Sequence, residues 1–166
     1  MIFVCSMSDL FHKDVPFEYI KLVFSAMAEA DRHTFQVLTK RPERASNLWG
    51  PWIPWNPNIW FGITAENQEW WEKRRDAFFA TPAAVHFLSY EPALGPLVLS
   101  DDDLAWLDWV ICGPETGPGA RGIAEFEPRA RSLRDQCTEA GVPFFLKKNT
   151  NGTRQIDGRE WSEMPV

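Results

Sequence analysis

The chain has 166 residues, of which 45% are hydrophobic, 14% are aromatic and 24% are charged. This length and composition are typical of one folded domain, here residues 1–166, and they exclude an intrinsically disordered protein. The net charge of -6 at pH 7 excludes a generally basic protein that coats nucleic acid, although it leaves a local basic patch open. No apolar run approaches the roughly 20 residues of a membrane-spanning helix, so we expect no membrane partner. The three widely spaced cysteines fit no disulfide framework, so we expect a reducing, cytoplasmic compartment.

Short apolar runs alternate with amphipathic stretches along the chain. Six runs are typical of buried strands because they are short and rich in Val, Ile, Phe or Trp. They cover residues 2–5, 34–38, 58–63, 84–88, 106–112 and 142–146. Apolar periodicity and helix-start residues predict helices over residues 16–30, 41–48, 67–80 and 127–140.

Strands that alternate with helices indicate an α/β fold with a parallel sheet and right-handed crossovers. Two architectures fit this pattern, a partial (β/α) barrel of TIM-like type and an open doubly wound parallel sheet. No GxGxxG or GxxxxGK[ST] motif follows a predicted strand, so the sequence does not support a dinucleotide or P-loop sheet. We therefore expect a partial barrel with about six mostly parallel strands, with the doubly wound sheet as the alternative.

An aromatic segment, LWGPWIPWNPNIWFG, precedes and enters the third predicted strand. Its tryptophans are Trp49, Trp52, Trp55 and Trp60. The interspersed prolines exclude a helix or a central strand over most of it. Two interpretations remain open, a loop that covers the core and a platform on which a flat ligand or base stacks.

Polar residues follow every predicted strand, which is where parallel α/β folds place their sites. A helix dipole alone could explain Glu66 or Glu91, but it disfavours Lys40 and Arg41 at the start of a helix. We therefore predict a functional rim at the carboxyl ends of the strands. Its candidate residues are Ser8, Asp9, His12, Lys40, Arg41, Glu66, Asn67, Glu91, Glu115, Arg121 and Lys147.

The sequence gives little evidence for a metal site or for a catalytic nucleophile. His12 is the only histidine at the predicted rim, and a metal hydrolase needs several ligands that converge. Cys5, Cys112 and Cys137 are too far apart for a close-spaced metal motif, so we expect no metal site. The glycine-rich GPETGPGAR segment, which ends at Arg121, could instead surround a phosphate or carboxylate with backbone N–H groups.

Several motifs, taken in order, resemble a family of uncharacterised proteins that is common in phages and prophages. The resemblance covers nearly the whole chain and rests on SMSDLFHKDVP, FQVLTKRPER, TAENQ, SYEPALGP, LDWVICGPETGPGAR, RSLRDQC, GVPFFLKK and the closing DGREWSEMP. The SMSD and TKRPE segments are also similar to strand-end motifs of radical-SAM enzymes related to the repair of DNA photoproducts.

The resemblance implies cofactors for full-length relatives, which carry an N-terminal cysteine triplet for a [4Fe–4S] cluster that cleaves S-adenosylmethionine on a partial barrel. This chain starts at Met1 on its first strand without such a triplet. We therefore expect a truncated relative or one half of a split enzyme, the C-terminal portion of a barrel, with no cofactor of its own.

The resemblance also implies roles for the rim residues. Ser8 and Asp9 would line the cofactor side, and Lys40 or Arg41 would meet the carboxylate of S-adenosylmethionine. The amine or the ribose hydroxyls of S-adenosylmethionine would bind to Glu66, Glu91 and Glu115. An anionic substrate would be contacted by Arg121 and Lys147.

Two functions follow, and the sequence leaves both open. One is a radical-SAM-like protein related to enzymes that modify or repair nucleic acid. The other is a non-catalytic, phage-encoded module that binds nucleic acid or a host protein in the host cytoplasm. Residues 2–5 form an uncharged, apolar edge, so we also expect a homodimer or a polypeptide that supplies further strands there.

Overall fold

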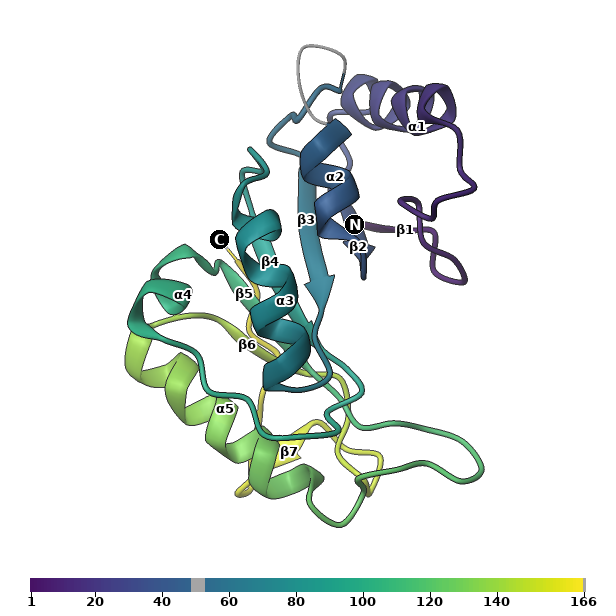
Figure 1. Ribbon diagram of the computed structural model, residues 1–166. Helices are drawn as coiled ribbons and strands as arrows, with labels where there is room; N and C mark the ends of the chain where they lie inside the picture. Colours follow the sequence, from purple (N-terminus) through teal and green to yellow (C-terminus); the bar gives the residue numbers. More distant parts are fainter. Residues whose placement is uncertain (49–52, 166) are drawn as a thin grey trace. The chain divides into compact units, whose positions relative to one another are not determined.

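The computed structural model describes residues 1–48 and 53–165, so the predictions for Trp49 and Trp52 lie outside the described residues (Figure 1). The chain divides into two compact units, Met1–Ile63 with Lys73–His86, and Thr64–Glu72 with Phe87–Val166. The expected single domain stays a prediction. The elements are, in chain order, β1 (Ile2–Val4), α1 (Phe17–Glu29), β2 (Phe35–Thr39), α2 (Pro42–Leu48), β3 (Ile59–Thr64), α3 (Gln68–Phe79), β4 (His86–Tyr90), α4 (Asp101–Trp106), β5 (Trp109–Cys112), α5 (Phe126–Ala140), β6 (Phe144–Leu146), β7 (Gln155–Ile156) and β8 (Arg159–Glu160).

The six longer strands belong to one parallel sheet in the order β1-β2-β3-β4-β5-β6. Hydrogen bonds from Phe61 N to Val85 O (2.9 Å) and from Ala65 N to Ser89 O (3.1 Å) join β3 to the segment that contains β4. A doubly wound sheet reverses its strand order at a switch point, whereas a (β/α) barrel keeps the sequence order. The fold is therefore α/β with the strand order of a partial (β/α) barrel, as the sequence predicts.

Burial explains why the inner strands are easy to recognise in the sequence. All residues of β4 and β5 are buried, as is typical of inner strands of a parallel sheet, so these strands show no alternation of buried and exposed positions. β1 differs, since Ile2 and Phe3 are exposed. The six predicted strands are confirmed, apart from shifts at their ends.

The largest correction concerns residues 106–112, which the sequence predicts as one strand. Trp106 instead ends α4, and β5 begins only at Trp109. Ser100 starts α4 with a capping box: its side chain accepts a hydrogen bond from Asp103 N, and the Asp103 carboxylate accepts one from Ser100 N. This local pairing satisfies the helix start, so the apolar residues that follow turn as a helix before the strand begins.

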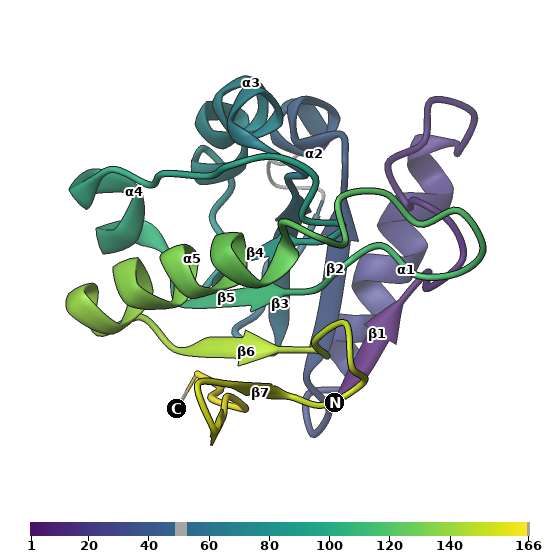
Figure 2. The same ribbon diagram turned by 90° about the horizontal axis from the view of Figure 1, so that it is seen from below.

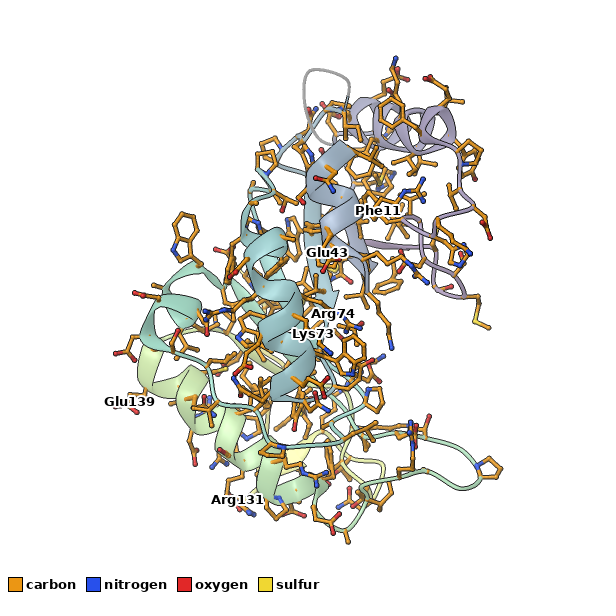
Figure 3. The ribbon with its side chains drawn as sticks, in the orientation of Figure 1. Phe11, Glu43, Lys73, Arg74, Arg131 and Glu139 are labelled. Carbon is orange, nitrogen blue, oxygen red and sulfur yellow. The ribbon has the colours of Figure 1, made fainter. Side chains whose placement is uncertain are left out.

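An aromatic cluster forms the core of the first unit. Phe11, labelled in Figure 3, is fully buried, and the distance between its ring centroid and that of Phe61 is 6.0 Å. Trp55 packs edge-on against Phe24 at 5.0 Å and against Phe61 at 5.2 Å. At Trp55, therefore, the aromatic segment covers the core.

The C-terminal segment finishes the second unit. β7 and β8 form an antiparallel hairpin that the sequence did not predict, and the chain after β8 returns to β6, where Ser162 bridges Phe145 (Figure 2). α5 ends as predicted at Gly141, whose φ of 72° is a conformation that glycine adopts without strain. None of the described helices has the length and apolar character needed to span a membrane.

Candidate functional site

Asp9 holds the segment after β1 to the carboxyl end of β2. Its carboxylate accepts hydrogen bonds from Thr39 Oγ1 at 2.8 Å, Lys40 N at 3.1 Å and Arg41 Nη1 at 2.7 Å. It also accepts one from Phe11 N at 2.9 Å within its own loop. Four donors occupy the two oxygens of Asp9, so this residue anchors the strand ends.

The same contacts explain why Arg41 is tolerated at the start of α2. The helix dipole disfavours positive charge at this position, so Lys40 and Arg41 call for a compensating negative charge. Asp9 supplies that charge for Arg41, and the Asp9 side chain is only 16% exposed whereas that of Arg41 is 41% exposed. Lys40 is exposed at the end of β2.

Ser8 and His12 shape the loop after β1. Ser8 is exposed, and its backbone N–H donates to Cys5 O at 3.0 Å. The carbonyl of His12 accepts a hydrogen bond from the Arg44 guanidinium, and its imidazole Nδ1 lies 3.4 Å from the Asp14 carboxylate. The structure thus uses the backbone of both candidates, while the His12 ring pairs with an exposed neighbour.

Glu91 and Lys147 meet at the carboxyl ends of the strands of the second unit. Glu91 follows β4, Lys147 follows β6, and Lys147 Nζ lies 2.9 Å from Glu91 Oε2. Gly113, which follows β5, leaves the room for this contact, because a Cβ there would lie 3.0 Å from Glu91 Oε1. The two side chains remain 27% and 53% exposed, respectively, so the pair is accessible to a ligand.

Glu115 and Arg121 close the base of the glycine-rich loop. Arg121 donates to the Glu115 carboxylate from its backbone N (2.6 Å), from Nε (3.0 Å) and from Nη2 (2.6 Å). These hydrogen bonds lower the pKa of Glu115 to about 2 and raise the pKa of Arg121. Glu115 thus remains a carboxylate at neutral pH, and the loop is held closed at its base by its own ion pair.

Asn67 and Glu66 connect the end of β3 to α3. Asn67 Oδ1 accepts a hydrogen bond from Trp70 N at 3.1 Å, which is a helix N-cap, so the main role visible for Asn67 is structural. The Glu66 carbonyl accepts hydrogen bonds from Leu94 N at 2.9 Å and Gly95 N at 3.2 Å. Glu66 therefore fixes the chain that follows β4 through its backbone.

Two residues that shape this region, Gly113 and Tyr90, were not among the candidates predicted from the sequence. Gly113 is recognisable in the sequence as a glycine directly after a strand, a position that leaves space for a neighbouring side chain. Tyr90 ends β4, is fully buried and donates its hydroxyl hydrogen bond to Gly95 O. Burial raises the pKa of Tyr90, so it stays a neutral phenol that supports the chain around Glu91.

The cysteines do not fit an iron–sulfur cluster, which needs three converging thiolates. Cys112 and Cys137 are fully buried, and burial raises the pKa of both thiols, that of Cys137 to about 12. Cys5 is a free cysteine on the loop after β1. Over residues 1–48 and 53–165, no three His, Cys, Asp or Glu side chains are grouped so that they could hold a metal ion.

Comparison with known proteins places the chain in a family. No curated protein and no solved structure matches it. A family model, in contrast, matches residues 1–165, which is nearly the whole chain. The chain therefore belongs to the family described as "Protein of unknown function (DUF5131)".

Proposed function

We propose that this chain is a phage-type, radical-SAM-like (β/α) domain that binds nucleic acid at the carboxyl ends of its strands and serves in its modification or repair. The pair of Glu91 and Lys147 carries the proposal. Gly113 makes room for it, the two charges lie 2.9 Å apart, and both side chains remain partly exposed. Barrel folds bind their ligands at this end of the sheet.

The end of β2 supports the kinship with radical-SAM enzymes. The resemblance rests in part on the SMSD and TKRPE segments, and Asp9 of the first accepts hydrogen bonds from Thr39, Lys40 and Arg41 of the second. The two segments are thus one hydrogen-bonded unit, although 30 residues separate Asp9 from Thr39. A shared unit of this kind is a stronger basis for kinship than two separate short motifs.

Binding roles are all that we assign to this chain, because its cysteines do not fit a cluster. In the radical-SAM enzymes that the SMSD and TKRPE segments resemble, the cluster and S-adenosylmethionine supply radical chemistry. In this chain, Lys40 or Arg41 is the proposed partner of the cofactor's carboxylate, and Lys147 is the proposed partner of a phosphate of the substrate. Glu91 holds the Lys147 ammonium in place until the substrate competes for it.

Binding of labelled DNA oligonucleotides, followed by fluorescence anisotropy at low salt, tests the proposal. Lys147→Met removes the cation and should weaken binding. Glu91→Gln keeps the shape of the side chain but releases Lys147, so it should leave binding unchanged or strengthen it. A wild-type chain that does not bind single- or double-stranded DNA, or variants that bind alike, would contradict the proposal.

A non-catalytic binding module is the second candidate, and the buried, protonated Cys112 and Cys137 favour it. Anaerobic reconstitution with iron and sulfide tests whether this chain can hold a cluster. We expect the purified chain to acquire no stoichiometric cluster and to show no broad cluster absorbance. A stoichiometric [4Fe–4S] cluster would favour the enzyme and would require ligands from more than one chain.

A further inference from the structure

A basic loop joins β6 to the C-terminal hairpin. Residues 147–154 read KKNTNGTR, with cations at Lys147, Lys148 and Arg154 and no acidic residue. The next acidic residue, Asp157, is already paired, since Arg131 Nη2 and Arg134 Nη1 each donate to its carboxylate at 2.8 Å. Arg131 extends from α5 in Figure 3. The loop therefore carries local positive charge on a chain whose net charge is negative.

Asn149 holds this loop in one shape. It is only 4% exposed, and its Nδ2 donates to Gln155 O at 3.0 Å while its Oδ1 accepts from Thr150 N at 2.7 Å. Its backbone N–H donates across the loop to Thr153 O at 2.5 Å. A buried amide whose donor and acceptor are both used fixes the backbone on either side of it.

The tip of the loop is ordered in the same way. Asn151 Oδ1 accepts hydrogen bonds from both the backbone N (2.9 Å) and the Oγ1 (2.8 Å) of Thr153. Gly152 has a φ of 85°, which a residue with a side chain adopts only under strain. The loop is thus shaped before any ligand arrives, and a preformed loop loses little conformational entropy on binding.

The cations of the loop differ in how they are held. Lys147 pairs with Glu91 in the strand-end site, whereas Lys148 is exposed and forms no ion pair within the described part of the chain. The Arg154 guanidinium lies over the Phe145 ring at 5.2 Å, and its Nε donates to Lys147 O at 3.3 Å. Those two contacts hold Arg154 in place, and no described residue accepts a hydrogen bond from its Nη groups.

We infer that residues 147–154 form a phosphate-binding loop for the backbone of a nucleic acid, in which Lys148 and Arg154 contact phosphates and Asn149 sets the shape. The inference rests on the proposed function, because the same strand would continue to Lys147 in the strand-end site. Phosphate contacts from Lys and Arg on a fixed backbone position a nucleic acid without reading its sequence. The loop therefore binds different sequences with similar affinity.

The salt dependence of binding tests this loop directly. The double variant Lys148→Gln/Arg154→Gln removes both cations, and Lys13→Gln/Arg32→Gln removes one exposed lysine and one exposed arginine of the first unit as a matched control. Binding of a labelled single-stranded oligonucleotide is measured over a series of salt concentrations. Loss of two phosphate contacts should make the negative slope of log K against log salt shallower by about 1.4 and weaken low-salt binding about tenfold or more. The control should retain the wild-type slope.

Each outcome decides the inference. If the wild type binds but the loop variant behaves like the control, the loop is not the phosphate contact, while the proposed function stands. If the wild type binds no oligonucleotide, both proposals fail. If inorganic phosphate displaces the oligonucleotide at matched phosphate concentration, the loop binds free phosphate and its assignment to nucleic acid is wrong. Circular dichroism and thermal unfolding confirm that both double variants fold.

Discussion

The two edge strands of the sheet, β1 and β6, differ in whether another segment of the chain covers them. At β6, Leu146 N donates to Trp161 O at 2.9 Å and Glu163 N donates to Phe144 O at 3.2 Å, so the chain's own C-terminal segment covers the outer edge. At the other edge, β1 pairs with β2 alone within the described residues. An uncovered strand edge is a template for pairing with another chain, so the two edges predict different behaviour in solution.

The cover over β6 is built from both backbone and side chains. Trp161 is 6% exposed, and its ring lies 6.0 Å from Phe144 in an edge-on arrangement. The Glu163 carboxylate accepts a hydrogen bond from Phe144 N at 3.0 Å, which satisfies an amide of the edge strand. A buried aromatic residue thus holds in place the segment that satisfies the strand's polar groups.

The β1 edge is apolar and open. Ile2 and Phe3 are 42% and 43% exposed, respectively. A hollow of about 370 Å³ beside the strand is lined by Ile2, Val4, Val23, Ala26, Met27 and Phe35. The strand has no charged or proline residue of the kind that guards solitary edges. We therefore expect this edge to be covered by a second copy or by another polypeptide.

The largest effect should come from removing the cover of β6. Trp161→Ala leaves a cavity against Phe144 and should lower the free energy of unfolding by about 3–5 kcal/mol. Urea unfolding followed by circular dichroism measures this loss. Tyr19→Ala is the control, since Tyr19 is 56% exposed and its loss should cost no more than about 0.5 kcal/mol. Equal effects of the two variants would show that the cover does not stabilise the edge.

A smaller loss should follow from releasing the segment after β1. Asp9→Ala removes four hydrogen bonds and leaves the hydroxyl of Thr39, which is 2% exposed, without this acceptor. We expect the free energy of unfolding to fall by about 2–4 kcal/mol, because buried polar groups then lose their partner. Asp14→Ala, at an exposed carboxylate, is the control for the same denaturant titration. A loss below about 1 kcal/mol would show that Asp9 is no anchor.

Changing the β1 edge should alter association more than stability. Phe3→Lys adds a guarding charge, so it should abolish concentration-dependent association of the chain while changing the free energy of unfolding by less than about 1 kcal/mol. Sedimentation velocity over a range of concentrations measures the association. Val98→Lys, at a residue 65% exposed in the second unit, should leave it unchanged. A wild-type chain that stays monomeric at every concentration would show that the bare edge is tolerated.

The smallest effect concerns pH and the hairpin next to the β6 cover. Hydrogen bonds from Arg131 and Arg134 hold the pKa of Asp157 well below its ordinary value near 4. Its stabilising contribution is therefore full above that ordinary value and is lost as the pH falls further below it. Asp157→Asn should flatten the dependence of thermal stability on pH in this acidic range. An unchanged profile would show that the hairpin is held without this carboxylate.

Strand positions were predictable because buried strands consist mainly of apolar residues, and a run of apolar residues is visible in the sequence. β5 is buried along its whole length and appears in the sequence as an uninterrupted apolar run, whereas β4 is also buried throughout but includes His86 and Ser89. The same rule misled the prediction at Trp106, where apolar residues continue into α4 although Ser100 begins a capped helix. An apolar run of this length does not by itself distinguish a strand from a short buried helix.

The sequence by itself determined the α/β alternation and the positions of Asp9, Arg41, Glu91 and Lys147 after strands. Only the tertiary structure decided what these side chains do. Asp9 anchors the strand ends because three of its four donors lie 30 to 32 residues further along the chain, and Glu91 reaches Lys147 over Gly113 across 56 residues. Apolar periodicity is a local property of the chain, whereas a hydrogen bond between strand ends depends on which strands become neighbours.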